Sequence, residues 1–164
     1  MKKTYKMGII KLFFWSTFCQ IFILNNIYLS GYINPYYYIV FIFLMPSKSN
    51  KLLLLLLSLI LGLTIDIFSQ THGAHACACL LICYMKFALG SKKEENEESI
   101  NISKIPIIDF IGFILPLTIL HHFTLFFLER FSIEEIIPVI VLTISSTFFT
   151  VLLLIIHKIL MPQK

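Results

Sequence analysis

Residues 52–69 read LLLLLLSLILGLTIDIFS, an apolar run that carries one charged residue, Asp66. An α-helix rises about 1.5 Å per residue and the hydrocarbon core of a bilayer is about 30 Å thick, so a spanning helix needs about 20 apolar residues. The run has close to this length. It therefore predicts a helix that crosses a lipid bilayer.

The composition of the whole chain also indicates a protein that is embedded in lipid. Hydrophobic residues make up 58% of the 164 residues and charged residues 13%, whereas an average globular protein has about 25% charged residues. A domain this small has a large surface for its volume, and it could not hide so much apolar surface in one core. These numbers exclude an ordinary soluble domain and predict an all-α membrane protein.

Further apolar runs lie on both sides of residues 52–69. The weakest is Pro35–Met45, which is short and is followed by Pro46; it could be a short span or a loop that enters the membrane and returns. With this run counted, the sequence predicts six transmembrane helices in one membrane domain of residues 1–164. The expected spans are residues 8–29, 33–46, 51–69, 74–90, 105–128 and 134–158, with a cytoplasmic loop at residues 91–104.

The distribution of lysine decides between the two interpretations of Pro35–Met45. Basic residues in short loops favour the cytoplasmic side of the membrane. With six spans and a cytoplasmic N-terminus, all basic residues except Arg130 lie inside, which is twelve of the thirteen. A re-entrant loop would move five lysines outside, namely Lys48, Lys51, Lys92, Lys93 and Lys104. We therefore expect six spans with both termini in the cytoplasm.

Asp66 is an acid inside an otherwise apolar span. A charge in the middle of a bilayer costs roughly 2.5–3.5 kcal/mol, so this side chain should face the protein interior or an aqueous cavity. His75 lies just beyond the following turn, near the start of the next helix. We expect Asp66 to accept hydrogen bonds from His75, or from the free backbone amides at the start of that helix, and so to clamp the two helices together. A proton or ion relay is the functional alternative.

Several histidines and cysteines near this turn suggest a metal site, but their spacing argues against it. Cys77 and Cys79 are two residues apart, on nearly opposite faces of a helix, whereas a structural zinc site needs four converging ligands. We expect no metal and no other cofactor, and thiols that act as small packing residues. The side chains concerned are His72, His75, Cys77, Cys79 and Cys83.

Two further polar clusters lie near the outer ends of the expected spans. Of the adjacent His121 and His122, we expect one to face the bundle and the other to meet lipid or the interface. Tyr36, Tyr37 and Tyr38 are typical of an aromatic belt at the membrane surface. Both interpretations give these residues a structural role.

No catalytic pattern is recognisable in the chain. A nucleophile with its base, a phosphate-binding loop and a pair of carboxylates are all missing, and Ser69 and Thr71 beside His72 are explained as polar residues at a helix end. The sequence therefore predicts neither an enzyme nor a nucleic-acid-binding protein.

These segments resemble the MreD family, the rod shape-determining membrane proteins of bacteria. The most specific part is Gly62–Ser69 followed by Thr71–Ala76, where members of the family often read T-x-G-x-H-A-A-A. The resemblance also covers Asn25-Asn26, Gly31–Pro35, Pro46 and the leucine run Leu52–Ile60. The chain departs from the family at Cys77 and Cys79, where small residues are usual, and in its more acidic cytoplasmic loop. The positions implied to be structural or partner-related are Pro35, Pro46, Gly62, Asp66, Ser69, Gly73, His75 and Ala76.

The resemblance implies a non-catalytic scaffold of the bacterial cell-elongation complex, located in the inner membrane. The implied partners are an MreC-like protein and, through it, the elongation transpeptidase, RodA and MreB. The family is similar in fold to the substrate-binding subunits of energy-coupling-factor transporters, so a small-molecule-binding transporter subunit is the alternative. A proton-coupled channel or pump is a third possible function. A transporter subunit should present a polar cavity between the outer helix ends, where we expect few hydrogen-bonding residues beyond Asp66, His75 and Glu129.

Overall fold

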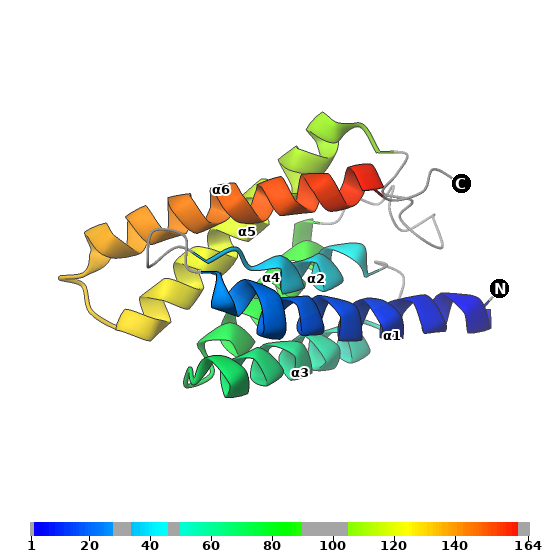
Figure 1. Ribbon diagram of the computed structural model, residues 1–164, viewed down its shortest axis with the longest axis horizontal. Coiled ribbons are helices and arrows are strands. Elements are labelled where there is room, and N and C mark those ends of the chain that lie inside the picture. The colour runs from blue at the N-terminus through cyan, green and yellow to red at the C-terminus, as the bar shows by residue number, and fades with distance from the viewer. Residues whose placement is uncertain (1, 28–33, 46–49, 90–104, 161–164) are drawn as a thin grey trace.

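The computed structural model describes residues 2–27, 34–45, 50–89 and 105–160, and the regular secondary structure in these ranges is helical throughout. Figure 1 shows the helices packed lengthwise into one bundle. The α-helices are α1 (Lys2–Phe18), α2 (Val40–Leu44), α3 (Lys51–Ser69), α4 (Ala74–Leu89), α5 (Ile107–Arg130) and α6 (Ile136–Leu160). A π-helical segment (Cys19–Ile23) and a 3-10 turn (Leu24–Asn26) continue α1, and a 3-10 turn (Tyr37–Ile39) precedes α2.

Four of the described helical segments are long and apolar enough to cross a membrane: Gly8–Asn26, Lys51–Ser69, Ile107–Arg130 and Ile136–Leu160. The helix α4 is apolar but shorter. The outward faces carry large apolar side chains, such as Phe14, Ile67 and Phe148, which lipid would cover and water would not favour. The chain is therefore an all-helical protein with several membrane-spanning candidates. The expected cytoplasmic loop, residues 91–104, lies outside the described residues.

The bounds of α3 follow from its sequence. The Asn50 side chain caps the first turn by accepting hydrogen bonds from the amides of Leu52 (3.0 Å) and Leu53 (3.5 Å), which have no partner within the helix. At the other end, Gln70 adopts a left-handed conformation (φ 57°) that closes the helix. The helix therefore has the bounds predicted for residues 51–69, and it is long and apolar enough to cross a membrane.

The segment expected to form the second span differs most from its prediction. Its helical part, Tyr37–Leu44, is only roughly 12 Å long at 1.5 Å per residue, too short to cross a bilayer as a helix. Every side chain from Tyr36 to Phe43 is less than 10% exposed. The segment is thus a buried centre of the bundle, and the three tyrosines do not form an aromatic belt because protein surrounds them.

The direction of this buried segment follows from its contacts with α4. Tyr38 bonds to His75 at the start of α4, and the carbonyls of Ile42 and Phe43 accept hydrogen bonds from Lys86 near the end of α4. The segment therefore runs parallel to α4. In Figure 1, α1 begins and α6 ends at the same end of the bundle, and the α3–α4 and α5–α6 turns lie at the opposite end. We call the latter the turn end.

Lys86 stabilises the end of α2. Its side chain is 1% exposed, and its ammonium donates hydrogen bonds to the carbonyls of Ile42 (2.9 Å), Phe43 (3.2 Å) and Met45. The last carbonyls of a helix lack partners within it and favour a nearby cation. We expected Lys86 at the cytoplasmic end of its span. The structure keeps it in the last turn of α4 but buries its charge inside the bundle, so the preference of basic residues for cytoplasmic loops does not apply to it.

Candidate functional site

The carboxylate of Asp66 joins α3 to α4. Its Oδ1 atom accepts hydrogen bonds from the backbone amide of His75 (3.0 Å) and the hydroxyl of Thr71 (2.5 Å), and its Oδ2 atom accepts one from the amide of Ala76 (2.9 Å). The amides at the start of α4 have no partner within that helix, and a carboxylate is favoured at this positive end. Of the two expected forms of the clamp, the backbone form is confirmed. The side chain of His75 bonds elsewhere.

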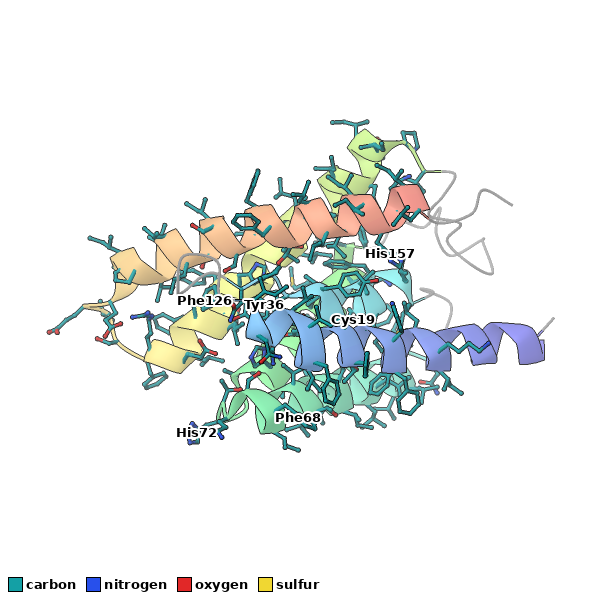
Figure 2. The ribbon with its side chains drawn as sticks, viewed as in Figure 1. Cys19, Tyr36, Phe68, His72, Phe126 and His157 are labelled. Carbon is teal, nitrogen blue, oxygen red and sulfur yellow. The ribbon has the colours of Figure 1, made fainter. Side chains whose placement is uncertain are left out.

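Two glycines allow this hairpin to close. A Cβ atom added to Gly62 would lie 2.4 Å from the Cα atom of Ala76, so the backbones of α3 and α4 touch there. Gly73, in the turn, has a φ of +90°, which residues with side chains rarely adopt. Figure 2 shows His72 beside it at the tip of the hairpin, pointing away from the bundle. The motif from Gly62 to Ala76 is therefore one structural unit.

Tyr38 connects this hairpin to α5. Its hydroxyl lies 2.8 Å from Nδ1 of His75 and 2.9 Å from Nε2 of His121, and all three side chains are at most 1% exposed. The buried amide of Gln20 holds the same segment, because Oε1 accepts from the amide of Tyr38 (3.4 Å) and Nε2 donates to the carbonyl of Pro35 (3.2 Å). Four separate parts of the chain thus meet through hydrogen bonds in the core.

His122 belongs to a second polar group between α5 and α6. Its Nδ1 lies 3.0 Å from the hydroxyl of Thr147 and its Nε2 lies 3.4 Å from that of Thr150, which also accepts a hydrogen bond from the amide of Tyr36 (2.9 Å). His121 and His122 are both 0% exposed. The expectation that one of them meets lipid or the interface is therefore wrong, because the buried segment and α6 cover both sides of this part of α5.

The remaining motif positions surround the same end of the bundle. Pro35 is buried and its carbonyl is held by Gln20. The hydroxyl of Ser69 accepts a hydrogen bond from Asn25 (3.1 Å), which ties the end of α3 to the end of α1. Pro46 lies outside the described residues.

A cavity of about 650 Å³ opens at the turn end of the bundle. Tyr36 and Phe126, adjacent in Figure 2 with ring centroids 6.0 Å apart, lie on its wall. Polar residues from four helix ends and the α3–α4 turn complete it: Asn25, Asn26, Asn34, Ser69, Gln70, Thr71, His75, Glu129 and Arg130. The expectation of few hydrogen-bonding residues here is wrong. The sequence could not show that the ends of α1, α3 and α5 converge.

The cysteines follow the expected helical phase. Cys79 and Cys83 are buried on one face of α4, whereas Cys77 is exposed on the other. Within the described residues no three histidine, cysteine, aspartate or glutamate side chains converge as metal ligands. Cys79 and Cys83 are therefore placed to pack in the core, whereas Cys77 is not.

The hydrogen-bonded groups limit what the site can do chemically. Both carboxylate oxygens of Asp66 are occupied, and the chain from His75 through Tyr38 ends at Nδ1 of His121, which is buried without a partner among the described residues. A relay would need a continuous path. The described part of the core holds the helices in place, and the polar cavity at the turn end stays open.

Fold and site together define an α-helical membrane protein with a hydrogen-bonded core and a polar cavity at one end. Comparison of the chain with protein-family models, with curated proteins and with solved structures gave no match. The function is therefore argued from the site itself and from the motif that builds it.

Proposed function

We propose that this protein is a non-catalytic membrane scaffold of the bacterial cell-elongation complex, similar to MreD, and that it binds an MreC-like partner. The observation that carries the proposal is the role of the motif Gly62–Ala76. Its residues form the backbone contact, the turn and the carboxylate clamp of a rigid hairpin. A motif with these structural roles fits a non-catalytic scaffold, which acts by presenting a rigid surface to its partner.

The occupied state of Asp66 supports this proposal over a proton-coupled channel or pump. An acid that carries protons has to exchange them with water or with another titratable group. Here the two oxygens accept three hydrogen bonds, two of them from backbone amides that cannot move away without opening the hairpin. The carboxylate therefore acts as a structural anion.

The scaffold would cross the inner membrane six times with both termini in the cytoplasm; the second crossing, whose helix is short, would be made inside the protein, where irregular backbone does not meet lipid. In Figure 1 the start of α1 and the end of α6 lie at the same end of the bundle, which supports an even number of crossings. The turn end would then face outward, with His72 at its tip. In a Cys77→Ala background, His72→Cys should react with a membrane-impermeant maleimide in intact cells. Protection in intact cells and labelling only after permeabilisation would reverse the orientation.

A pull-down tests the scaffold proposal directly. The tagged chain, extracted in mild detergent, should recover an MreC-like protein that mass spectrometry identifies, and Gly62→Ala should recover less of it than Gly112→Ala. In its bacterial host, depletion of the protein should round rod-shaped cells. Normal cell shape together with no recovered MreC-like protein would contradict the proposal.

The cavity favours a second candidate, a small-molecule-binding subunit of the energy-coupling-factor type. Its volume of about 650 Å³ lies within the usual range of ligand sites, roughly 300–1,000 Å³. Loss of uptake of a vitamin-like compound on depletion, with cell shape unchanged, would favour this candidate over the scaffold.

A further inference from the structure

We propose that the cavity at the turn end binds an uncharged, ring-shaped molecule whose carbonyl or hydroxyl oxygen accepts a hydrogen bond from the Nε2–H group of His75. This inference deepens the second candidate function, and it is also compatible with a scaffold. It rests on the protonated nitrogen of His75, on the neutral polar lining, and on the local geometry at the end of α1.

The hydrogen bonds of Tyr38 determine which nitrogen of His75 carries the proton. The tyrosine hydroxyl has one hydrogen, and the two ring nitrogens beside it, Nδ1 of His75 and Nε2 of His121, are stronger acceptors than the nearby Cys79 thiol, so it donates to one of these two nitrogens. If it donated to His121, that ring would carry its proton on Nδ1, which is buried without a partner among the described residues. A buried N–H group without an acceptor costs about 1–3 kcal/mol.

The other arrangement leaves a lone pair at Nδ1 of His121 in place of the N–H group, and unpartnered buried acceptors are less rare in proteins than unpartnered buried N–H groups. His121 then donates from Nε2 to the hydroxyl of Tyr38, and the hydroxyl donates to Nδ1 of His75. His75 consequently carries its proton on Nε2. His75 is 1% exposed and lines the cavity, and within the described residues its Nε2 atom has no hydrogen-bond partner. The site thus presents one buried, oriented donor that an oxygen of a ligand would satisfy.

The remaining lining is mostly neutral. The amide of Gln70 and the Oδ1 atom of Asn26 lie on the cavity without a hydrogen-bond partner among the described residues, so each can bind a polar group of a ligand. Arg130 forms an ion pair with Glu135, which offsets its charge. The carboxylate of Glu129 lies on the same wall and would repel an anion. These features favour an uncharged ligand.

Aromatic walls favour a ring. The rings of Tyr36 and Phe126 meet at 65° with their centroids 6.0 Å apart, and Phe22 and Phe68 also line the cavity. Aromatic faces pack well against flat or ring-shaped groups. The combination of apolar walls with a few oriented polar groups is typical of small-molecule sites.

The end of α1 is shaped around this cavity. The α-helix changes to a π-helical segment at Cys19–Ile23 and then to a 3-10 turn at Leu24–Asn26, and both segments contribute lining residues. π-helical segments are rare and frequently occur at functional sites. A regular helix would direct these side chains differently.

The test uses the purified full-length chain in detergent and three named probes. Uridine and N-acetylglucosamine are uncharged rings with a carbonyl group, and glucuronate is a ring that carries a negative charge. At about 100 times its Kd, a bound probe should raise the midpoint of thermal unfolding by about 5 °C or more. We expect this rise with at least one uncharged probe and none with glucuronate. No rise with either uncharged probe, or an equal rise with glucuronate, would overturn the proposal.

Variants locate the binding. His75→Phe should abolish the rise, as should Leu142→Trp, which fills part of the cavity from α6 without touching the hydrogen-bonded core. His157→Phe is the matched control, because it removes a similar bond, 2.7 Å from Nδ1 to the hydroxyl of Tyr37, outside the cavity lining. In His157→Phe the probe should raise the unfolding midpoint as much as in the unchanged protein. An unchanged rise in Leu142→Trp would place the probe elsewhere and contradict the proposal.

Nitrogen-15 spectra of the histidine rings give a second readout that needs no ligand. The ring of His75 should carry its proton on Nε2, and Tyr38→Phe should change that signal. A proton on Nδ1 would overturn the assignment. These measurements are independent of the scaffold proposal, since recovery of an MreC-like protein does not depend on an occupied cavity.

Discussion

Gly62 of α3 lies against Ala76 of α4 so closely that an added Cβ atom would be 2.4 Å from the Cα atom of Ala76. The helices are in backbone contact at this point, and Asp66 begins its bonds to α4 one helical turn further on. Contact and clamp together explain why small residues and an acid occur in the same motif. Close approach of backbones through small residues is a general means of helix association in membranes.

Gly62→Ala should destabilise the protein by about 1–2 kcal/mol. Overpacking costs about 1–3 kcal/mol, and the better helix propensity of alanine offsets at most about 1 kcal/mol of it. Unfolding by denaturing detergent measures the difference. Gly112→Ala, where nothing lies within 4 Å, is the control and should be neutral or slightly stabilising. Equal effects of the two substitutions would contradict the backbone contact.

Asp66→Ala should cost about 3 kcal/mol or more. It leaves the amides of His75 and Ala76 and the hydroxyl of Thr71 without their acceptor, and hydrogen bonds to a charged group contribute about 1.5–3 kcal/mol each. Asp109→Ala removes an exposed carboxylate from the first turn of α5 and should cost less than about 1 kcal/mol. Similar losses in the two variants would show that Asp66 is not a clamp.

A double-mutant cycle separates the two forms of the clamp. Asp66→Asn and His75→Ala should be additive within about 0.5 kcal/mol, because the bond to Asp66 comes from the backbone amide of His75 and not from its ring. Tyr38→Phe and His75→Phe share a hydrogen bond and should show a coupling of about 0.5–3 kcal/mol. A large coupling between Asp66 and His75 would instead indicate a bond between their side chains.

Lys86→Met should destabilise the buried segment by about 2 kcal/mol or more. Methionine keeps the apolar stem but leaves the carbonyls of Ile42, Phe43 and Met45 without this donor inside the protein. Unfolding free energy in detergent measures the loss, and faster hydrogen exchange of the backbone amides of α2 gives a second readout. Lys11→Met, on the exposed surface of α1, is the control and should change stability by less than about 0.5 kcal/mol.

Much of the helical pattern was accessible from the sequence, because it depends on local properties. The expected span at residues 51–69 coincides with α3, and that at 74–90 ends one residue beyond α4. The amide form of the Asp66 clamp also followed from local rules, since a buried acid near a tight turn meets the free amides of the next helix. The first, fifth and sixth expected spans differ from the helices by a few residues or by the π-helical segment.

Tertiary structure decided which apolar surfaces face protein and which face outward. Lipid is about as apolar as leucine, so the hydropathy of residues 36–43 could not reveal that α1, α4, α5 and α6 surround them. The burial of His121, His122 and Lys86 followed from that placement. The cavity depends on four helix ends and a turn that are far apart in the sequence. Sequence alone therefore determined a membrane-embedded helical chain with a clamped hairpin. Packing in three dimensions decided the polar core and the open cavity, because the burial of a side chain depends on neighbours that hydropathy does not specify.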